Sequence, residues 1–82
     1  MSRTVTVKLK TPVTSMGETI TEVTVRPPTV RDRLIADKTP GSASDKELTF
    51  ISNLCGLPPE VMMDLDLADY MQLQNAVNDF LS

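Results

Sequence analysis

Three aspartates, Asp64, Asp66 and Asp69, have the spacing that comes closest to a metal or acid–base site. An EF-hand loop places oxygen ligands at alternating positions, with a central glycine and a glutamate at its twelfth position. Here leucine and alanine separate the acids, glycine is missing from the stretch, and no glutamate lies at the required distance. We therefore expect Asp66 to cap a helix and Asp69 to lie in its first turn, where negative charge is favourable.

The residues that nucleophilic and metal-assisted catalysis need are also missing from the 82-residue sequence. The chain contains no histidine, so neither an imidazole base nor a histidine metal ligand is available. Its single cysteine, Cys55, cannot form an internal disulfide, which fits a reducing compartment. Cys55 ends an apolar helical pattern, so we expect it to be a buried small hydrophobe. The sequence predicts no cofactor, no metal and no enzymatic activity.

Charge is unevenly distributed along the chain. The formal net charge is −3, but residues 1–38 carry seven Lys/Arg against four Asp/Glu, whereas residues 39–82 carry one lysine against seven acids. Arg26, Arg31 and Arg33 form only a thin basic patch, so nucleic-acid binding, which depends on Lys and Arg, is not expected. The oppositely charged halves either keep the chain in solution or attract a second copy or another partner.

Two segments with a period of two predict a β-hairpin over residues 4–26. Pro12 has no N–H to donate to a sheet, so we expect it to end the first strand or mark its edge. Residues 15–18 contain a glycine and predict the turn. In the return strand Ile20 is out of phase with the valines, which indicates a bulge there or a strand that buries side chains on both faces.

Residues 29–81 predict three to four short helices separated by helix-breaking residues. Thr29, with an aspartate three residues later, begins a helix of about two turns. Residues 39–43 contain proline and glycine and predict a flexible exposed loop. Ser44 and Glu47 have the spacing of a second capping box, which predicts a helix from there to the cysteine.

Two further helices complete this half of the chain. Pro58 and Pro59 begin a short helix, because proline is tolerated in a first turn, and the last helix runs from Leu67 to about Leu81. Strands come first and helices follow, so the sequence predicts an α+β fold in one small domain. No apolar run approaches the ~18–20 residues that span a bilayer, and no signal peptide is visible, so we expect neither a membrane segment nor secretion.

The last predicted helix is apolar over a wider arc than one core requires. At ~100° per residue its apolar side chains cover roughly 180°, whereas a helix on one core needs only about 100°. One explanation is that the helix is sandwiched between the hairpin and another helix; the other is that part of the arc binds a partner. On the second explanation, the candidate partner-binding residues are Leu67, Tyr70, Met71, Leu73, Val77, Phe80, Leu81 and, from the preceding helix, Met62.

The order of these signals resembles the small tail assembly chaperones of Mu-like contractile-tailed phages and prophages. The resemblance covers nearly the whole chain and is carried by residues 5–13, 17–18, 23–32, 54–60 and 65–70. It implies a non-enzymatic protein of the host cytoplasm that binds the long helical tape measure protein. It also implies help with polymerisation of tail tube protein around that tape measure protein, and departure before the virion is complete.

Self-association and two other functions complete the expectations. We expect a homo-oligomer, because the hairpin edges and the wide apolar arc both need cover. One alternative function is a small phage DNA-binding regulator that uses Arg26, Arg31 and Arg33. The other is a structural tail component that remains in the virion.

Overall fold

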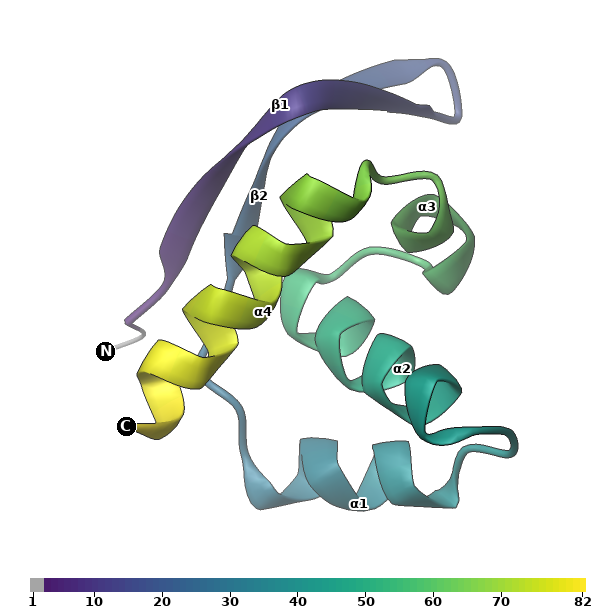
Figure 1. Ribbon diagram of the computed structural model, residues 1–82, viewed down its shortest axis with the longest axis vertical. Helices are drawn as coiled ribbons and strands as arrows, with labels where there is room; N and C mark the ends of the chain where they lie inside the picture. The colour runs from purple at the N-terminus through teal and green to yellow at the C-terminus, as the bar shows by residue number, and fades with distance from the viewer. Residues whose placement is uncertain (1–2) are drawn as a thin grey trace.

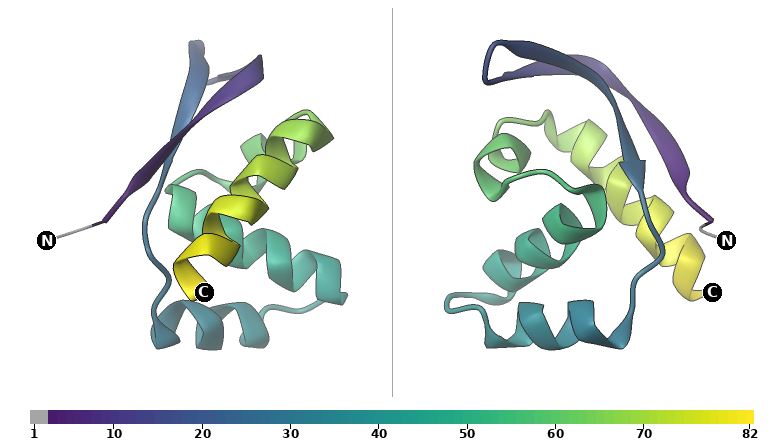
Figure 2. Two further views of the ribbon diagram at one scale, coloured as in Figure 1. Left: turned by 60° about the vertical axis from the view of Figure 1, so that its left-hand side comes forward. Right: turned by 180° about the vertical axis from the view of Figure 1, so that it is seen from behind.

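The computed structural model describes residues 3–82 and has the predicted α+β fold, a hairpin layer packed on a helical layer (Figure 1, Figure 2). Its strands and helices, in chain order, are β1 (Val5–Ser15), β2 (Glu18–Val25), α1 (Val30–Lys38), α2 (Ala43–Cys55), α3 (Pro59–Met63) and α4 (Leu67–Leu81). Among the described residues, no helix is both long and apolar enough to cross a membrane.

The antiparallel hairpin is longer and less regular than the sequence predicts. β1 continues through Pro12 to Ser15, so the prediction that proline ends the strand is wrong. The ladder is irregular between Lys8 and Val13. These residues are five positions apart in β1, whereas their partners in β2, Glu22 and Ile20, are two positions apart. Proline is accommodated because its missing N–H falls where strand pairing is interrupted. The extra residues therefore lie in β1, and not in the return strand where the phase of Ile20 indicated a bulge.

The predicted turn is confirmed as a two-residue loop. Met16 has a φ of 52° and Gly17 a φ of 80°, and the strands pair directly on either side of them. Two consecutive positive φ values are those of a type I′ turn, whose twist matches that of a hairpin. The Met16 side chain is 99% exposed at this tip.

The hairpin is held on α4 by a buried carboxylate. Asp69, in the first turn of α4, accepts hydrogen bonds from the backbone amides of Lys10 (2.9 Å) and Thr11 (3.0 Å), inside the irregular stretch of β1. These two bonds lower the pKa of Asp69. The predicted place of Asp69 is thus confirmed, and its side chain supplies the acceptors that two unpaired strand amides require.

The helix caps are those predicted, with one exception. Thr29 caps α1, Asp66 caps α4, and Gly56 ends α2 with a φ of 67°. The exception is α2, which begins two residues earlier than predicted: Ser42 is its cap and Asp45 completes the capping box. Both serines have an acid three residues later, so spacing alone does not distinguish them. The predicted loop therefore ends at residue 42.

The core lies between the inner face of the hairpin and the helices. α4 contacts both strands and α2, so it is sandwiched as the first explanation of its wide apolar arc required. The main cluster of buried apolar side chains includes none from α1 and consists of Leu9, Val13, Val23, Val25, Ile51, Leu54, Val61, Met62, Leu65, Leu73 and Val77. α1 is placed against α2 at the end of the molecule opposite α3 (Figure 1).

Candidate protein-binding groove

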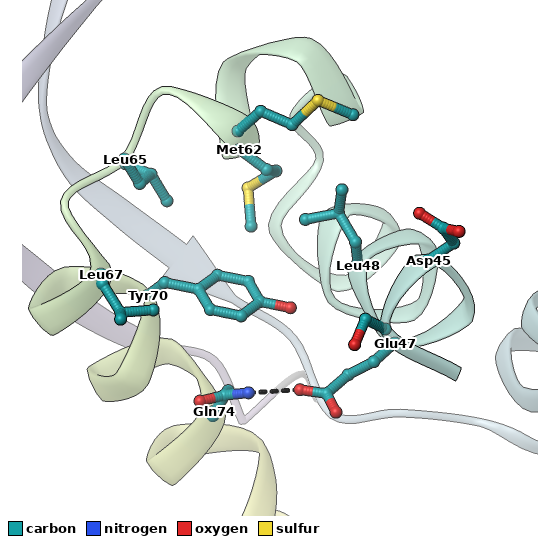
Figure 3. Close-up of a pocket in the computed structure, with 10 residues that line it drawn as sticks. Asp45, Glu47, Leu48, Met62, Leu65, Leu67, Tyr70 and Gln74 are labelled. Atoms are coloured by element: carbon teal, nitrogen blue, oxygen red, sulfur yellow. Dashed lines mark hydrogen bonds between the residues drawn. The ribbon is translucent and has the colours of Figure 1, made fainter. Parts of the chain in front are cut away.

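An open groove separates α2 from α4 below α3 (Figure 3). Its volume is about 460 Å³. α2 supplies one wall, α4 the facing wall, and α3 with the following loop closes one end. The lining residues are Ser44, Asp45, Glu47, Leu48, Met62, Met63, Leu65, Leu67, Tyr70 and Gln74.

The floor of the groove is apolar, and its rim has exposed apolar side chains. Met62 and Leu65 are buried and Leu48 is half-buried, so they form a surface that is already part of the core. Met63 and Leu67 on the rim are 67% and 69% exposed. Exposed apolar side chains beside an apolar floor are typical of a surface that binds another chain.

The α2 wall of the groove is acidic. Asp45 and Glu47 lie along it, and none of the lining residues is a lysine or arginine. The backbone and hydroxyl of Ser42 donate hydrogen bonds to Asp45 and lower the pKa of its carboxyl, which keeps it ionised at neutral pH. The groove therefore combines an apolar floor with negative charge along one edge, which favours an amphipathic ligand that has basic residues beside its apolar face.

Tyr70 projects from α4 across the groove, with its hydroxyl directed towards α2 (Figure 3). Burial, together with the negative charge of Glu47, raises the pKa of Tyr70 to about 12. Its phenol therefore stays neutral at physiological pH. A neutral aromatic ring with a polar tip is suited to binding a protein surface.

A hydrogen bond crosses the middle of the α2–α4 crevice. The Gln74 side-chain amide donates to the Glu47 carboxylate (Figure 3). On the other side of this pair lies a second hollow of about 360 Å³, which Glu47 and Gln74 also line. It reaches Phe50 on α2 and Leu81 at the end of α4. The crevice thus follows much of the length of α4, and one polar pair divides it.

The structure divides the predicted partner-binding residues into three groups. Leu73, Val77 and Met62 are buried and pack in the core of the chain. Tyr70 and Phe80 are half-buried against that core. The exposed members are Leu67, Met71 and Leu81, at 69%, 52% and 65%. Only Tyr70, Leu67 and Met62 line the larger hollow, while Val77 and Leu81 line the smaller one.

The acidic wall is the part of the groove that the sequence reasoning missed. Glu47 and Leu48 line the groove from α2, whereas the predicted capping box had assigned Glu47 to the helix start. In the structure Asp45 has that capping role, and Glu47 is hydrogen-bonded to Gln74 across the crevice. The Ser42–Asp45 spacing was the available signal, together with the Pro-Gly pair just before it.

The described residues offer little for catalysis or for nucleic-acid binding. Burial raises the pKa of the Cys55 thiol to about 11, so it stays protonated and unreactive. No group of three or more potential metal ligands occurs within residues 3–82. The Arg26 guanidinium is already bound to Asp32 by two hydrogen bonds of 2.7 Å. This pairing removes Arg26 from the basic patch on which a DNA-binding function was to depend.

Comparison with known proteins agrees with this picture. No curated protein and no solved structure matches the chain. Residues 6–82 match the family described as phage tail assembly chaperone proteins, E, or 41 or 14. Because the match extends over nearly the whole chain, this protein belongs to the phage tail assembly chaperone family.

Proposed function

We propose that this chaperone is non-enzymatic and binds a helical segment of the tape measure protein in the groove between α2 and α4. The single observation that carries the proposal is the groove itself, with its apolar floor, exposed Met63 and Leu67 on the rim, and acidic wall. An amphipathic helix binds such a groove through apolar residues spaced three and four positions apart. Basic residues beside those anchors would face Asp45 and Glu47.

The side chains of the groove suit a client with a varied sequence. Met62 and Met63 are unbranched thioethers that adapt to different apolar surfaces, so a single groove tolerates several related helical segments. Each contact is small, since the groove has a volume of only about 460 Å³. Many copies along one long client still hold it in solution, and each copy can dissociate as the tube advances.

In this proposal the chaperone acts in the host cytoplasm, assists the polymerisation of tail tube protein around the tape measure protein, and is absent from the finished virion. Mass spectrometry of purified particles distinguishes this role from that of a structural tail component. We expect no peptide of this chain in mature particles. Its presence in stoichiometric amounts would favour the structural alternative.

The direct test is co-expression with the tape measure reading frame of the same phage, followed by affinity capture of the tape measure protein. We expect the chaperone to raise the soluble yield of the tape measure protein and to be captured with it. Met63→Lys should reduce capture about tenfold, because it places a charge among the apolar anchors and repels basic client residues. Met63 is the last residue of α3, where a positive charge is compatible with the helix.

Met16→Lys is the matched control, since it makes the same substitution at an exposed methionine on the hairpin tip. It should leave capture unchanged. A tape measure protein that is equally soluble without the chaperone would contradict the proposal. Equal capture of the Met63→Lys variant and the wild type would show that the client binds elsewhere.

A further inference from the structure

The outer face of α1 is apolar and uncovered. Val30, Leu34 and Ile35 are 77%, 53% and 45% exposed, whereas the inner face of the helix packs through Ala36 and the buried Asp32. Val30 and Leu34 are four residues apart, so they lie one above the other along the helix. Three exposed aliphatic residues on a nine-residue helix are more than a solvent-facing surface requires.

Basic residues accompany this apolar face. Arg31 and Lys38 are exposed on the same side of α1, next to Ile35 and Leu34 on the helical wheel. The acids of α1 do not cancel them, because Asp32 is bound to Arg26 and Asp37 lies 3.9 Å from Arg33. The outer face of α1 therefore presents exposed apolar and basic side chains together and carries a net positive charge.

The groove of the same molecule cannot cover this face. α1 lies at one end of the helical layer and α3, which closes the groove, at the other (Figure 1, Figure 2). No residue of α1 lines the larger hollow. Lys46, the lysine of α2, holds the C-terminal end of α1 by donating to the carbonyl oxygens of Asp37 (2.9 Å) and Thr39 (2.7 Å). Within residues 3–82, therefore, nothing covers the outer face of α1.

We propose that the outer face of α1 of one copy docks in the acid-walled groove of a second copy. The apolar anchors Val30 and Leu34 would contact the rim and floor around Met63, and Arg31 and Lys38 would face the acidic α2 wall. On α1 the basic side chains lie among the apolar ones, between Leu34 and Ile35, and in the groove the acidic α2 wall lies beside the apolar floor. The two surfaces therefore combine apolar contact with opposite charge, which is the complementarity that selects a partner and its orientation. Pairing of α1 with α1 would instead bring like charges together.

This contact is head-to-tail, because α1 and the groove are different surfaces of the same molecule. Each copy that donates its α1 still has an empty groove, and each copy that accepts one still has an exposed α1. Association therefore continues beyond two copies, into an open chain or a closed ring. The prediction concerns this chain alone and does not depend on the tape measure protein or on the proposed function.

Light scattering coupled to size-exclusion chromatography tests the contact with two variants that each remove one side. Val30→Gln/Leu34→Gln replaces the anchors of α1 with a good helix former at exposed positions, and Met63→Lys removes the groove surface. We expect the wild type to exceed two chains at high concentration and each variant to be a single chain. An equimolar mixture of the two variants should form complexes of one chain of each. The α1 face of Met63→Lys can dock in the intact groove of the double variant, and neither chain can bind a third.

Several results would overturn the proposal. They are a wild type that stays a single chain at millimolar concentration, a variant that assembles like the wild type, or a mixture that stays as single chains. Loss of assembly in the Met16→Lys control would place the contact on the hairpin instead. Assembly should also weaken as salt rises, because salt screens charge pairs at an exposed rim. Circular dichroism of each variant verifies that it remains folded.

Discussion

At the scale of single residues, two buried aspartates, Asp32 and Asp69, hold different elements of the chain together. Asp69 accepts from amides 59 and 58 positions away. The sequence placed it correctly in the first turn of the last helix, but backbone amides have no sequence signature, so its partners could not be predicted. The Thr29–Asp32 capping box was predicted, because its groups are three residues apart. The ion pair between Arg26 and the same Asp32 carboxylate was not predicted.

The Arg26–Asp32 pair gives the first prediction at this scale. Arg26→Met should lower the free energy of unfolding by about 1–2 kcal/mol, because it leaves the buried Asp32 carboxylate without its two charged hydrogen bonds. The arginine side chain is 43% exposed, which keeps the loss in the lower part of the range for such pairs. Urea unfolding measures it. Arg31→Met, which removes an exposed arginine, should change stability by less than about 0.5 kcal/mol.

The pH dependence of stability follows from the same carboxyl groups. Hydrogen bonds from Arg26 to Asp32, and from the amides of Lys10 and Thr11 to Asp69, hold both pKa values below the ordinary value. A lowered pKa stabilises the fold fully above the unfolded pKa of about 3.9, and this contribution disappears as pH falls through the folded value. We expect a nearly constant melting temperature from pH 8 to 6 and a steep decrease below about pH 4.

Asp69→Asn tests that account. It should lower the melting temperature at pH 7 by several degrees. Its difference from the wild type should shrink as pH falls below the ordinary aspartate pKa and through the lowered pKa of the folded Asp69 carboxyl. Asp64→Asn is the control, because it makes the same substitution at an exposed aspartate. A wild type whose melting temperature stays the same from pH 7 to pH 2 would contradict the assignment.

At the scale of helices and strands, residue type and spacing predicted which elements form more reliably than where each begins and ends. The hairpin, the first cap and the last helix followed from local signals, whereas Pro12 and the start of α2 did not. Strand pairing tolerates Pro12 because it lies among the extra residues of β1, and the amides of two neighbours in that stretch donate to Asp69 in another element. The wide apolar arc of α4 identified one wall of the groove. It could not identify α2 as the other, because periodicity shows which face is apolar and not what lies opposite.

The start of α2 gives a prediction that separates the two candidate caps. Ser42→Ala should destabilise the protein by about 1 kcal/mol, since the Ser42 hydroxyl accepts from the Asp45 amide at 3.2 Å. Ser44→Ala should have almost no effect, because Ser44 lies inside the first turn and alanine is the better helix former. Thermal unfolding of the two variants decides the matter. A larger loss for Ser44→Ala would restore the start that the sequence predicted.

At the scale of the whole molecule, the proposals assign two ligands to one groove. A helical client and α1 of a neighbouring copy would both use the apolar floor around Met63 and the acidic wall. They are therefore competitors, and the fraction of empty grooves decreases as chaperone concentration rises. Apparent affinity for the client decreases in proportion to the fraction of grooves that are empty. Self-association would cover the groove of chaperone that has no client. A client with stronger apolar anchors would displace the neighbouring α1 from the groove.

This competition can be measured with a fluorescently labelled synthetic helix from the tape measure protein. Consider a chaperone concentration at which half of the wild-type grooves hold a neighbouring α1. There the apparent dissociation constant for the labelled helix should be about twofold larger for the wild type than for Val30→Gln/Leu34→Gln. The double variant keeps an intact groove and lacks the competing α1 face, so its affinity should not depend on chaperone concentration. Met63→Lys should bind weakly at every concentration. Equal affinities for the wild type and the double variant, under conditions where the wild type is assembled, would show that client and neighbouring copy bind to separate surfaces.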